Sequence, residues 1–124
     1  MATDIEILEG FHAHIYYDAD SKADAEALRT EIDACYDVEL GRWHDKPIGP
    51  HPFGSYQVTF TPEQFGDIVP WLALNRRDLI ILVHPQTGDD LIDHSDYAMW
   101  LGDSTALRLD RFREQAAKKA AQKA

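Results

Sequence analysis

Two histidines separated by a single residue, His12 and His14, lie within a short run of aromatic and β-branched residues, 11–17. The run follows Gly10 and ends before Asp18, a pattern that predicts a β-strand. Because side chains alternate between the two faces of a strand, both imidazoles point the same way, about 7 Å apart at Cα. Two imidazoles at that spacing can bind one metal ion. The alternative is a solvated polar face on a half-exposed sheet.

The chain has six histidines among 124 residues, and its net charge is -10. Each of the other four has a structural explanation to set beside a functional one. His51 could order the proline-rich loop 44–52, His84 could cap the end of a strand, and His94 could form a surface ion pair. His44, beside an aspartate in the same loop, is interpreted as a surface residue.

Periodicity predicts a strand–helix–strand–strand–helix–strand order, which is that of the ferredoxin-like α+β sandwich. Residues 91–102 suggest irregular structure or a short helical turn, and an extra C-terminal helix with frayed last turns is expected from residue 105 onward. We expect residues 1–124 to form a single domain. The predicted strands are 11–17, 38–43, 53–60 and 78–84, and the predicted helices are 21–36 and a second one that begins at Thr61.

The first predicted helix has an apolar stripe that ends at Cys35, so this cysteine is expected to be a buried small hydrophobe rather than a nucleophile. The second helix contains Pro70, which is expected to bend it or to end its first part. Both helices are expected to cover the sheet face that carries Phe11, Ala13 and Ile15. The histidine pair then lies on the opposite face.

In this topology we expect the first strand to be central, the third strand to run parallel to it and the fourth antiparallel. Three strand ends would then meet at one edge of the sheet and bring His51 and His84 toward the histidine pair. His94 could close over the resulting pocket, and Tyr16 and Trp100 could form its aromatic wall. The order of the elements thus predicts one histidine-lined cleft.

Several neutral imidazoles in one cleft suit Fe, Zn, Cu or Ni. Mononuclear iron oxygenases use two histidines and one carboxylate on one face of the metal. The spacing of the acidic residues does not identify which of them would be the carboxylate ligand. The available acidic residues are Glu39, Glu63, Asp89, Asp90, Asp93 and Asp96.

The composition limits which classes of binding partner and which cellular compartment we expect. The acidic balance disfavours nucleic acid and anionic membrane surfaces, which bind clustered Lys and Arg. A single cysteine excludes an internal disulfide and fits a reducing compartment. With no apolar run of transmembrane length and no visible signal peptide, a cytoplasmic location is expected.

Four motifs resemble the DOPA 4,5-dioxygenase family and occur in order at residues 11–17, 48–52, 83–90 and 93–102. The resemblance leaves out the tail after Gly102. It implies a ferredoxin-like fold, often a homodimer, and ring-opening oxygenation of a catechol such as L-DOPA by non-haem iron(II) and dioxygen. The last motif departs from the family pattern at Tyr97, where many members have a further histidine.

The resemblance carries the family histidines onto five positions of this chain. We assign His12, His14 and His84 as metal ligands because they lie on adjacent strands. His51 and His94, on loops, are assigned to acid–base catalysis or substrate contact. Iron(II) is the expected cofactor, with zinc or another divalent metal as the alternative in the protein as isolated.

Two interpretations that place the protein in other functional classes remain open. The first is a non-catalytic metal- or small-molecule-binding module on a dimeric scaffold, in which the same pocket holds a ligand without turnover. The second is a structural dimer in which the open sheet face pairs with itself and the histidines are interface polar groups.

Overall fold

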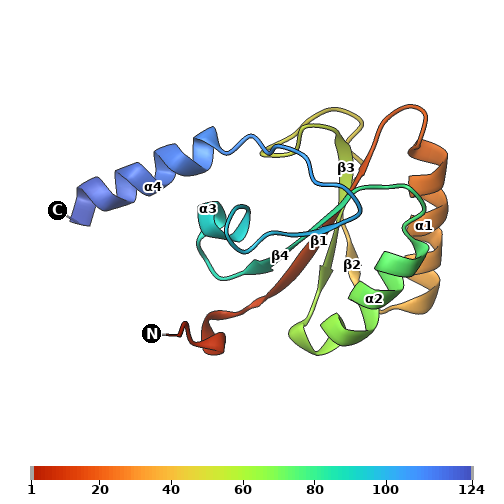
Figure 1. Ribbon diagram of the computed structural model, residues 1–124, viewed down its shortest axis with the longest axis horizontal. Helices are drawn as coiled ribbons and strands as arrows, with labels where there is room; N and C mark the ends of the chain where they lie inside the picture. The colour runs from red at the N-terminus through yellow and green to blue at the C-terminus, as the bar shows by residue number, and fades with distance from the viewer. Residues whose placement is uncertain (1, 124) are drawn as a thin grey trace.

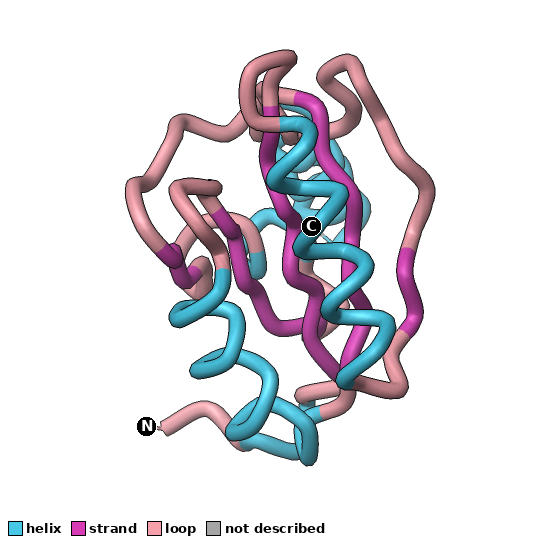
Figure 2. Tube along the Cα trace, turned by 90° about the vertical axis from the view of Figure 1, so that its right-hand side faces the viewer, coloured by secondary structure: helices cyan, strands magenta, loops and turns pink. Residues whose placement is uncertain are grey.

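The computed structural model describes residues 2–123 and contains one five-stranded sheet with the strand order β2-β3-β1-β4-β5. Strand β1 (Gly10–Tyr17) is central, between β3 (Gly54–Phe60) and β4 (Ile81–Gln86). The helices α1 (Lys22–Cys35) and α2 (Phe65–Asn75) lie side by side over one face of this sheet (Figures 1 and 2). The fold is therefore α+β and consistent with the predicted ferredoxin-like sandwich.

The predicted direction of the third strand is wrong. Both β3 and β4 run antiparallel to β1, and the start of β3 pairs with the end of β1, as Gly54 does with Tyr17. The loop that precedes β3 therefore arrives at the C-terminal end of β1, on the side of Tyr16, rather than at its start. His51 approaches the other histidines from that end.

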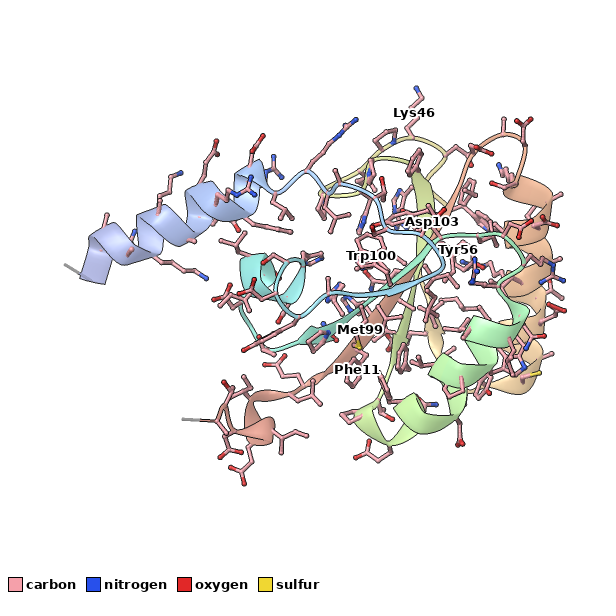
Figure 3. The ribbon with its side chains drawn as sticks, viewed as in Figure 1. Phe11, Lys46, Tyr56, Met99, Trp100 and Asp103 are labelled. Atoms are coloured by element: carbon pink, nitrogen blue, oxygen red, sulfur yellow. The ribbon has the colours of Figure 1, made fainter. Side chains whose placement is uncertain are left out.

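Alternation along β1 separates the core from the opposite face as predicted. Phe11, Ala13 and Ile15 belong to the buried hydrophobic cluster, together with the helix residues Leu28 and Leu72. Figure 3 shows Tyr56 on the helix side of the sheet, where its hydroxyl donates a 2.9 Å hydrogen bond to the Ala25 carbonyl of α1. The aliphatic stripes of the two helices thus bury one whole face of the sheet.

One prediction about the helices is wrong. Cys35 is exposed because it is the last residue of α1 and lies beyond the edge of the core that Ile32 enters. Pro70 lies inside α2 and does not end it, since the helix continues to Asn75, and a bend at Pro70 stays a prediction. The predicted start at Thr61 is confirmed: its side chain and that of Gln64 form a capping box around the 3-10 turn η2 (Pro62–Gln64).

The remaining elements are short or lie outside the helix-covered face. The predicted second strand shrinks to β2 (Glu39–Leu40), and the segment expected to be irregular contains α3 (Asp90–Asp93) and a fifth strand, β5 (Met99–Leu101). A 3-10 turn, η1 (Ile5–Ile7), precedes β1. The C-terminal helix α4 (Asp110–Lys123) begins later than predicted, and the turns expected to fray are helical to Lys123. Figure 1 shows α3 and α4 on the side of the sheet away from α1 and α2.

Among residues 2–123, no helix combines the length and the apolar character needed to cross a lipid bilayer.

The helix face that enters the core can be tested with two leucines of α2. Leu72 is fully buried, whereas Leu74 is 85% exposed. We expect Leu72→Ala to lower the free energy of unfolding by about 2–5 kcal/mol, since it leaves a cavity in the core. Leu74→Ala should change it by less than about 0.5 kcal/mol. Urea denaturation of both variants measures this, and equal losses would contradict the described packing.

Candidate functional site

The pairing of β1 with β4 brings three histidines together on the face away from the helices. His12 pairs with His84, and His14 lies two residues further along the same strand face. His14 is 4% exposed and His84 is 2% exposed, and their Nε2 atoms lie 3.0 Å apart. One ligand atom from each of the three histidines lies within 4.8 Å of the other two. The three could therefore hold a single metal ion.

The hydrogen bonds of His84 determine which nitrogen faces this centre. Its Nδ1 lies 2.9 Å from the Pro85 carbonyl oxygen, which can only accept, so Nδ1 carries the proton of the neutral ring. The Nε2 lone pair then faces His14, whose Nε2 donates to it. Histidine nitrogens lie about 2.1 Å from a bound zinc ion, so two nitrogens that share one ion can lie no more than about 4.2 Å apart. The observed separation fits a cation in place of the shared proton.

Electrostatics keep these rings neutral, which is the form that binds metals. Burial lowers the pKa of His14 well below its ordinary value, and the nearby His51 and His84 lower it further. Burial, followed by the neighbouring His94, lowers the pKa of His84 to about 3. The pKa of His12 is lowered by burial and then by His94. At neutral pH all three therefore offer a lone pair.

Sequence reasoning missed the partner of His12. The Gln57 side chain donates from Nε2 to His12 Nε2 over 3.3 Å and to the Thr59 hydroxyl over 3.1 Å. Alternation along β3 was the available signal, because Tyr56 and Val58 enter the core and Gln57 must then lie on the histidine face. A cation bound to His12 Nε2 would displace this amide.

His51 reaches the cleft from the loop between β2 and β3. Its backbone amide donates to the Ile48 carbonyl over 3.0 Å, and the neighbouring Pro50 carbonyl accepts from the Arg108 amide over 2.8 Å. The centroid of the His51 ring lies 4.1 Å from that of His14. The loop is thus fixed both to itself and to the segment that leads into α4.

The Tyr16 hydroxyl lies 2.6 Å from His51 Nδ1. Burial raises the pKa of Tyr16, so the hydroxyl keeps its proton, and within residues 2–123 it has no second hydrogen-bond partner. It therefore donates to Nδ1, which leaves the proton of neutral His51 on Nε2. Burial, followed by the neighbouring His94, lowers the pKa of His51 to about 4. His51 thus presents an N–H donor at its free nitrogen.

His94, the residue after α3, completes the cluster. Its Nδ1 donates to the Asp90 carbonyl over 2.7 Å, so the neutral ring has a lone pair on Nε2. Its ring centroid lies 4.0 Å from that of His84 and 4.8 Å from the Phe112 ring of α4. The predicted closure of His94 over the other histidines is therefore observed.

The other predicted residues lie as follows. Tyr16 and Trp100 are neighbours with ring centroids 6.4 Å apart, and Figure 3 shows Trp100 on the cleft side of the sheet. His44 is half-buried at the edge of the sheet, where its backbone pairs with Ser55. Tyr97 is 36% exposed.

The structure explains why no carboxylate could be chosen from spacing. Of the six acidic candidates, Asp90 and Asp93 line the cleft, and Asp93 is buried. Both Asp93 oxygens accept hydrogen bonds from Thr87, from its backbone N–H over 2.9 Å and from its hydroxyl over 2.7 Å. Among residues 2–123, the group whose ligand atoms converge consists of histidines and no carboxylate.

Two cavities open from the cluster, and both are lined in part by His14 and His51. The cleft has a volume of about 410 Å³ and is lined by the five clustered histidines, which are His12, His14, His51, His84 and His94. A second groove of about 370 Å³ runs from the same rings toward the edge of the sheet and is lined by residues of the segment 41–51 and by Ser55 and Gln57. A small molecule that enters either cavity therefore meets the imidazoles.

An antiparallel sheet with helices on one face and a buried histidine cluster on the other defines a candidate metal-dependent enzyme. The chain belongs to the Dopa 4,5-dioxygenase family, whose model matches residues 11–111.

Proteins similar to this chain include two sequences and one solved structure. An uncharacterized 21.2 kDa protein of Botryotinia fuckeliana is 37% identical over 133 residues, covering 95% of this chain and 71% of that protein. A DOPA 4,5-dioxygenase of Amanita muscaria is 38% identical over 115 residues, covering 86% of this chain but only 50% of that protein. The crystal structure of a putative dioxygenase from Nostoc punctiforme is similar with a TM-score of 0.88 and 52% identity, covering 93% of this chain and 99% of that one.

The buried neutral histidines predict an acid-sensitive metal-free protein. Unfolded histidines take up protons near pH 6.5, whereas folded His51 and His84 resist protonation down to about 4 and about 3. The unfolded chain binds more protons in this window, so stability should fall as the pH drops through it. The slope is about 1.4 kcal/mol per pH unit for each histidine.

Urea unfolding of the EDTA-treated protein between about pH 7 and pH 5 measures this slope. The variant His51→Gln should show a shallower slope than the unsubstituted protein, because one fewer histidine takes up a proton on unfolding. A flat profile in both proteins would show that the cluster is protonated or exposed in the folded state.

Proposed function

We propose that the protein is an extradiol ring-cleaving dioxygenase that acts on a catechol such as L-DOPA and uses non-haem iron(II) and dioxygen. The observation that carries the proposal is the buried cluster itself, in which His14 and His84 present Nε2 atoms 3.0 Å apart beside His12. Membership of the Dopa 4,5-dioxygenase family supports it.

His12, His14 and His84 would hold the metal. A bound iron(II) ion supplies Lewis acidity toward a catechol and the capacity to activate dioxygen. The protein holds the ligand set in place through the paired strands β1 and β4, and the hydrogen bond from His84 Nδ1 to the Pro85 carbonyl fixes the orientation of that ring.

His94 and His51 are suited to different roles toward a catechol. His94 has its Nε2 lone pair free because Nδ1 donates to the Asp90 carbonyl, so it can accept a proton from a catechol hydroxyl. His51 has its proton on Nε2 because Tyr16 donates to Nδ1, so it can donate to an oxygen of the substrate. We therefore assign His94 as the general base and His51 as a hydrogen-bond donor that contacts the substrate.

One observation favours a second candidate, a non-catalytic metal-binding module. The converging ligands are three histidines, whereas mononuclear iron oxygenases commonly combine two histidines with a carboxylate. Three histidines form a familiar zinc site. In this alternative, zinc would occupy the cleft without turnover.

The proposed ligands His12, His14 and His84 predict that histidine variants differ sharply in metal binding and oxygen uptake. His14→Ala and His84→Ala should each weaken iron(II) binding by more than about 100-fold, the upper end for loss of a residue that only supports a ligand. Both should also abolish oxygen uptake with L-DOPA after anaerobic reconstitution. Metal content by mass spectrometry and oxygen consumption with the visible spectrum of the product measure the two effects.

The variant His44→Gln is the matched control for metal content, because this histidine lies outside the converging group. It should retain one metal ion per chain. Stoichiometric metal without oxygen uptake by the unsubstituted protein, with any catechol tested, would favour the binding module. Undiminished metal content in His14→Ala would refute the site.

We further propose that residues 1–124 form one domain and that two copies form a homodimer. The gathering of buried residues into one cluster supports the single domain, and α4, which extends away from the sheet (Figure 1), offers a surface for a second copy. A cytoplasmic location stays a prediction from the single cysteine.

Light scattering after size-exclusion chromatography should give twice the chain mass. Removal of α4 by a stop codon at Asp110 should shift the mass toward that of a monomer if this helix forms the contact. A monomer at all concentrations of the full chain would contradict the dimer.

A further inference from the structure

The groove beside the cleft differs in charge from the rest of the molecule. The chain has 22 acidic residues, yet the described residues that line this groove include neither Asp nor Glu and do include Arg42. The other cavity at the same histidines is lined by Glu9, Asp90 and Asp93. An anion that approaches the imidazoles therefore meets less repulsion along the groove than through the cleft.

Backbone hydrogen bonds of the neighbouring residues fix where the main chain of Arg42 lies relative to the histidine cluster. On either side of it, the Gly41 amide donates to the Gln57 carbonyl over 2.7 Å and the His44 amide donates to the Ser55 carbonyl over 2.9 Å. Gln57 in turn pairs with His14. Arg42 thus lies two strand spacings from β1, about 10 Å across the sheet. An aromatic ring with a short side chain can span that interval.

Arg42 is also available for a ligand. It is exposed, and within residues 2–123 its guanidinium makes no ion pair with a carboxylate, in contrast to Arg77, which lies 2.8 Å from Glu31. Ile48, 47% exposed, gives the groove an apolar wall against which an aromatic ring can lie. The groove therefore combines an apolar surface with one uncompensated positive charge.

We propose that this groove is an anion subsite, in which Arg42 binds the carboxylate of a substrate whose aromatic ring reaches the histidines. The planar guanidinium can form two parallel hydrogen bonds to a carboxylate. The inference rests on the proposed function and goes beyond it in one respect: Arg42 is the residue that determines specificity for a negatively charged side chain on the catechol.

The test compares three catechols of similar size and different charge: 3,4-dihydroxyphenylacetate, 4-ethylcatechol and dopamine. In the iron-loaded protein, Arg42→Gln should lower kcat/KM for the anion by about tenfold to hundredfold, mainly through KM, and leave the neutral catechol unchanged. Arg42→Lys should restore part of the loss. Arg111→Gln, the same charge change on α4 outside the groove, is the matched control.

Calorimetric titration of the EDTA-treated protein with the same anion and the same neutral catechol provides a readout that is independent of turnover. Arg42-dependent preference for the anion in this titration supports the subsite, even if no catechol is cleaved and the proposed function fails. If the unsubstituted protein cleaves or binds all three catechols equally, binds none of them, or is weakened toward all of them alike by Arg42→Gln, the subsite is refuted.

Discussion

The in-register antiparallel pairing of β1 with β4 is the constraint on which the rest of the structure depends. It sets His12 opposite His84 and brings the Nε2 atoms of His14 and His84 to 3.0 Å. A slip of one residue would turn both β1 histidines into the hydrophobic core and turn Ala13 and Ile15 out into the cleft. The core beneath the sheet and the chemistry above it are thus fixed by the same strand.

The segments outside the sheet have a separate role. They exclude water from the histidine rings that the strands position. His94 lies between His84 and the Phe112 ring of α4, and the loop that carries His51 is bonded to the segment before α4 through Pro50 and Arg108. Burial is the largest cause of the lowered pKa values of His14, His51 and His84. The neutral state of the imidazoles is therefore a product of tertiary structure and not of the strands alone.

Sequence patterns predicted the faces of the elements better than their directions and ends. Period-two alternation placed His12 and His14 on one face and Ala13 on the other, because a strand with one buried face has no freedom in that respect. The same pattern holds no information about strand direction, and β3 runs opposite to the predicted sense. Cys35 continues the apolar stripe of its helix and is nevertheless exposed. Whether such a residue is buried depends on where the core ends, and the stripe does not show this.

The hydrogen-bond partners of the cleft residues could not be predicted from the sequence for a related reason. The Tyr16–His51 and Gln57–His12 pairs join residues distant in the chain, and Asp93 is used by Thr87 through a turn that spacing does not reveal. These contacts form only when loops of particular lengths close over the sheet. The strand histidines were therefore predictable as a group, whereas the tautomers of His51, His84 and His94 depend on partners that only the folded chain brings within reach.

The described division between strands and loops has a consequence for how such a protein can change. The histidines with converging ligand atoms come from β1 and β4, whereas His51, His94 and Arg42 come from connecting segments that tolerate substitution and insertion more readily than a central strand does. Mutations that reshape the surroundings of a bound molecule can therefore accumulate without disturbing the strand-borne set. A family built on this plan can diversify the molecules that it binds while the three strand histidines stay in place.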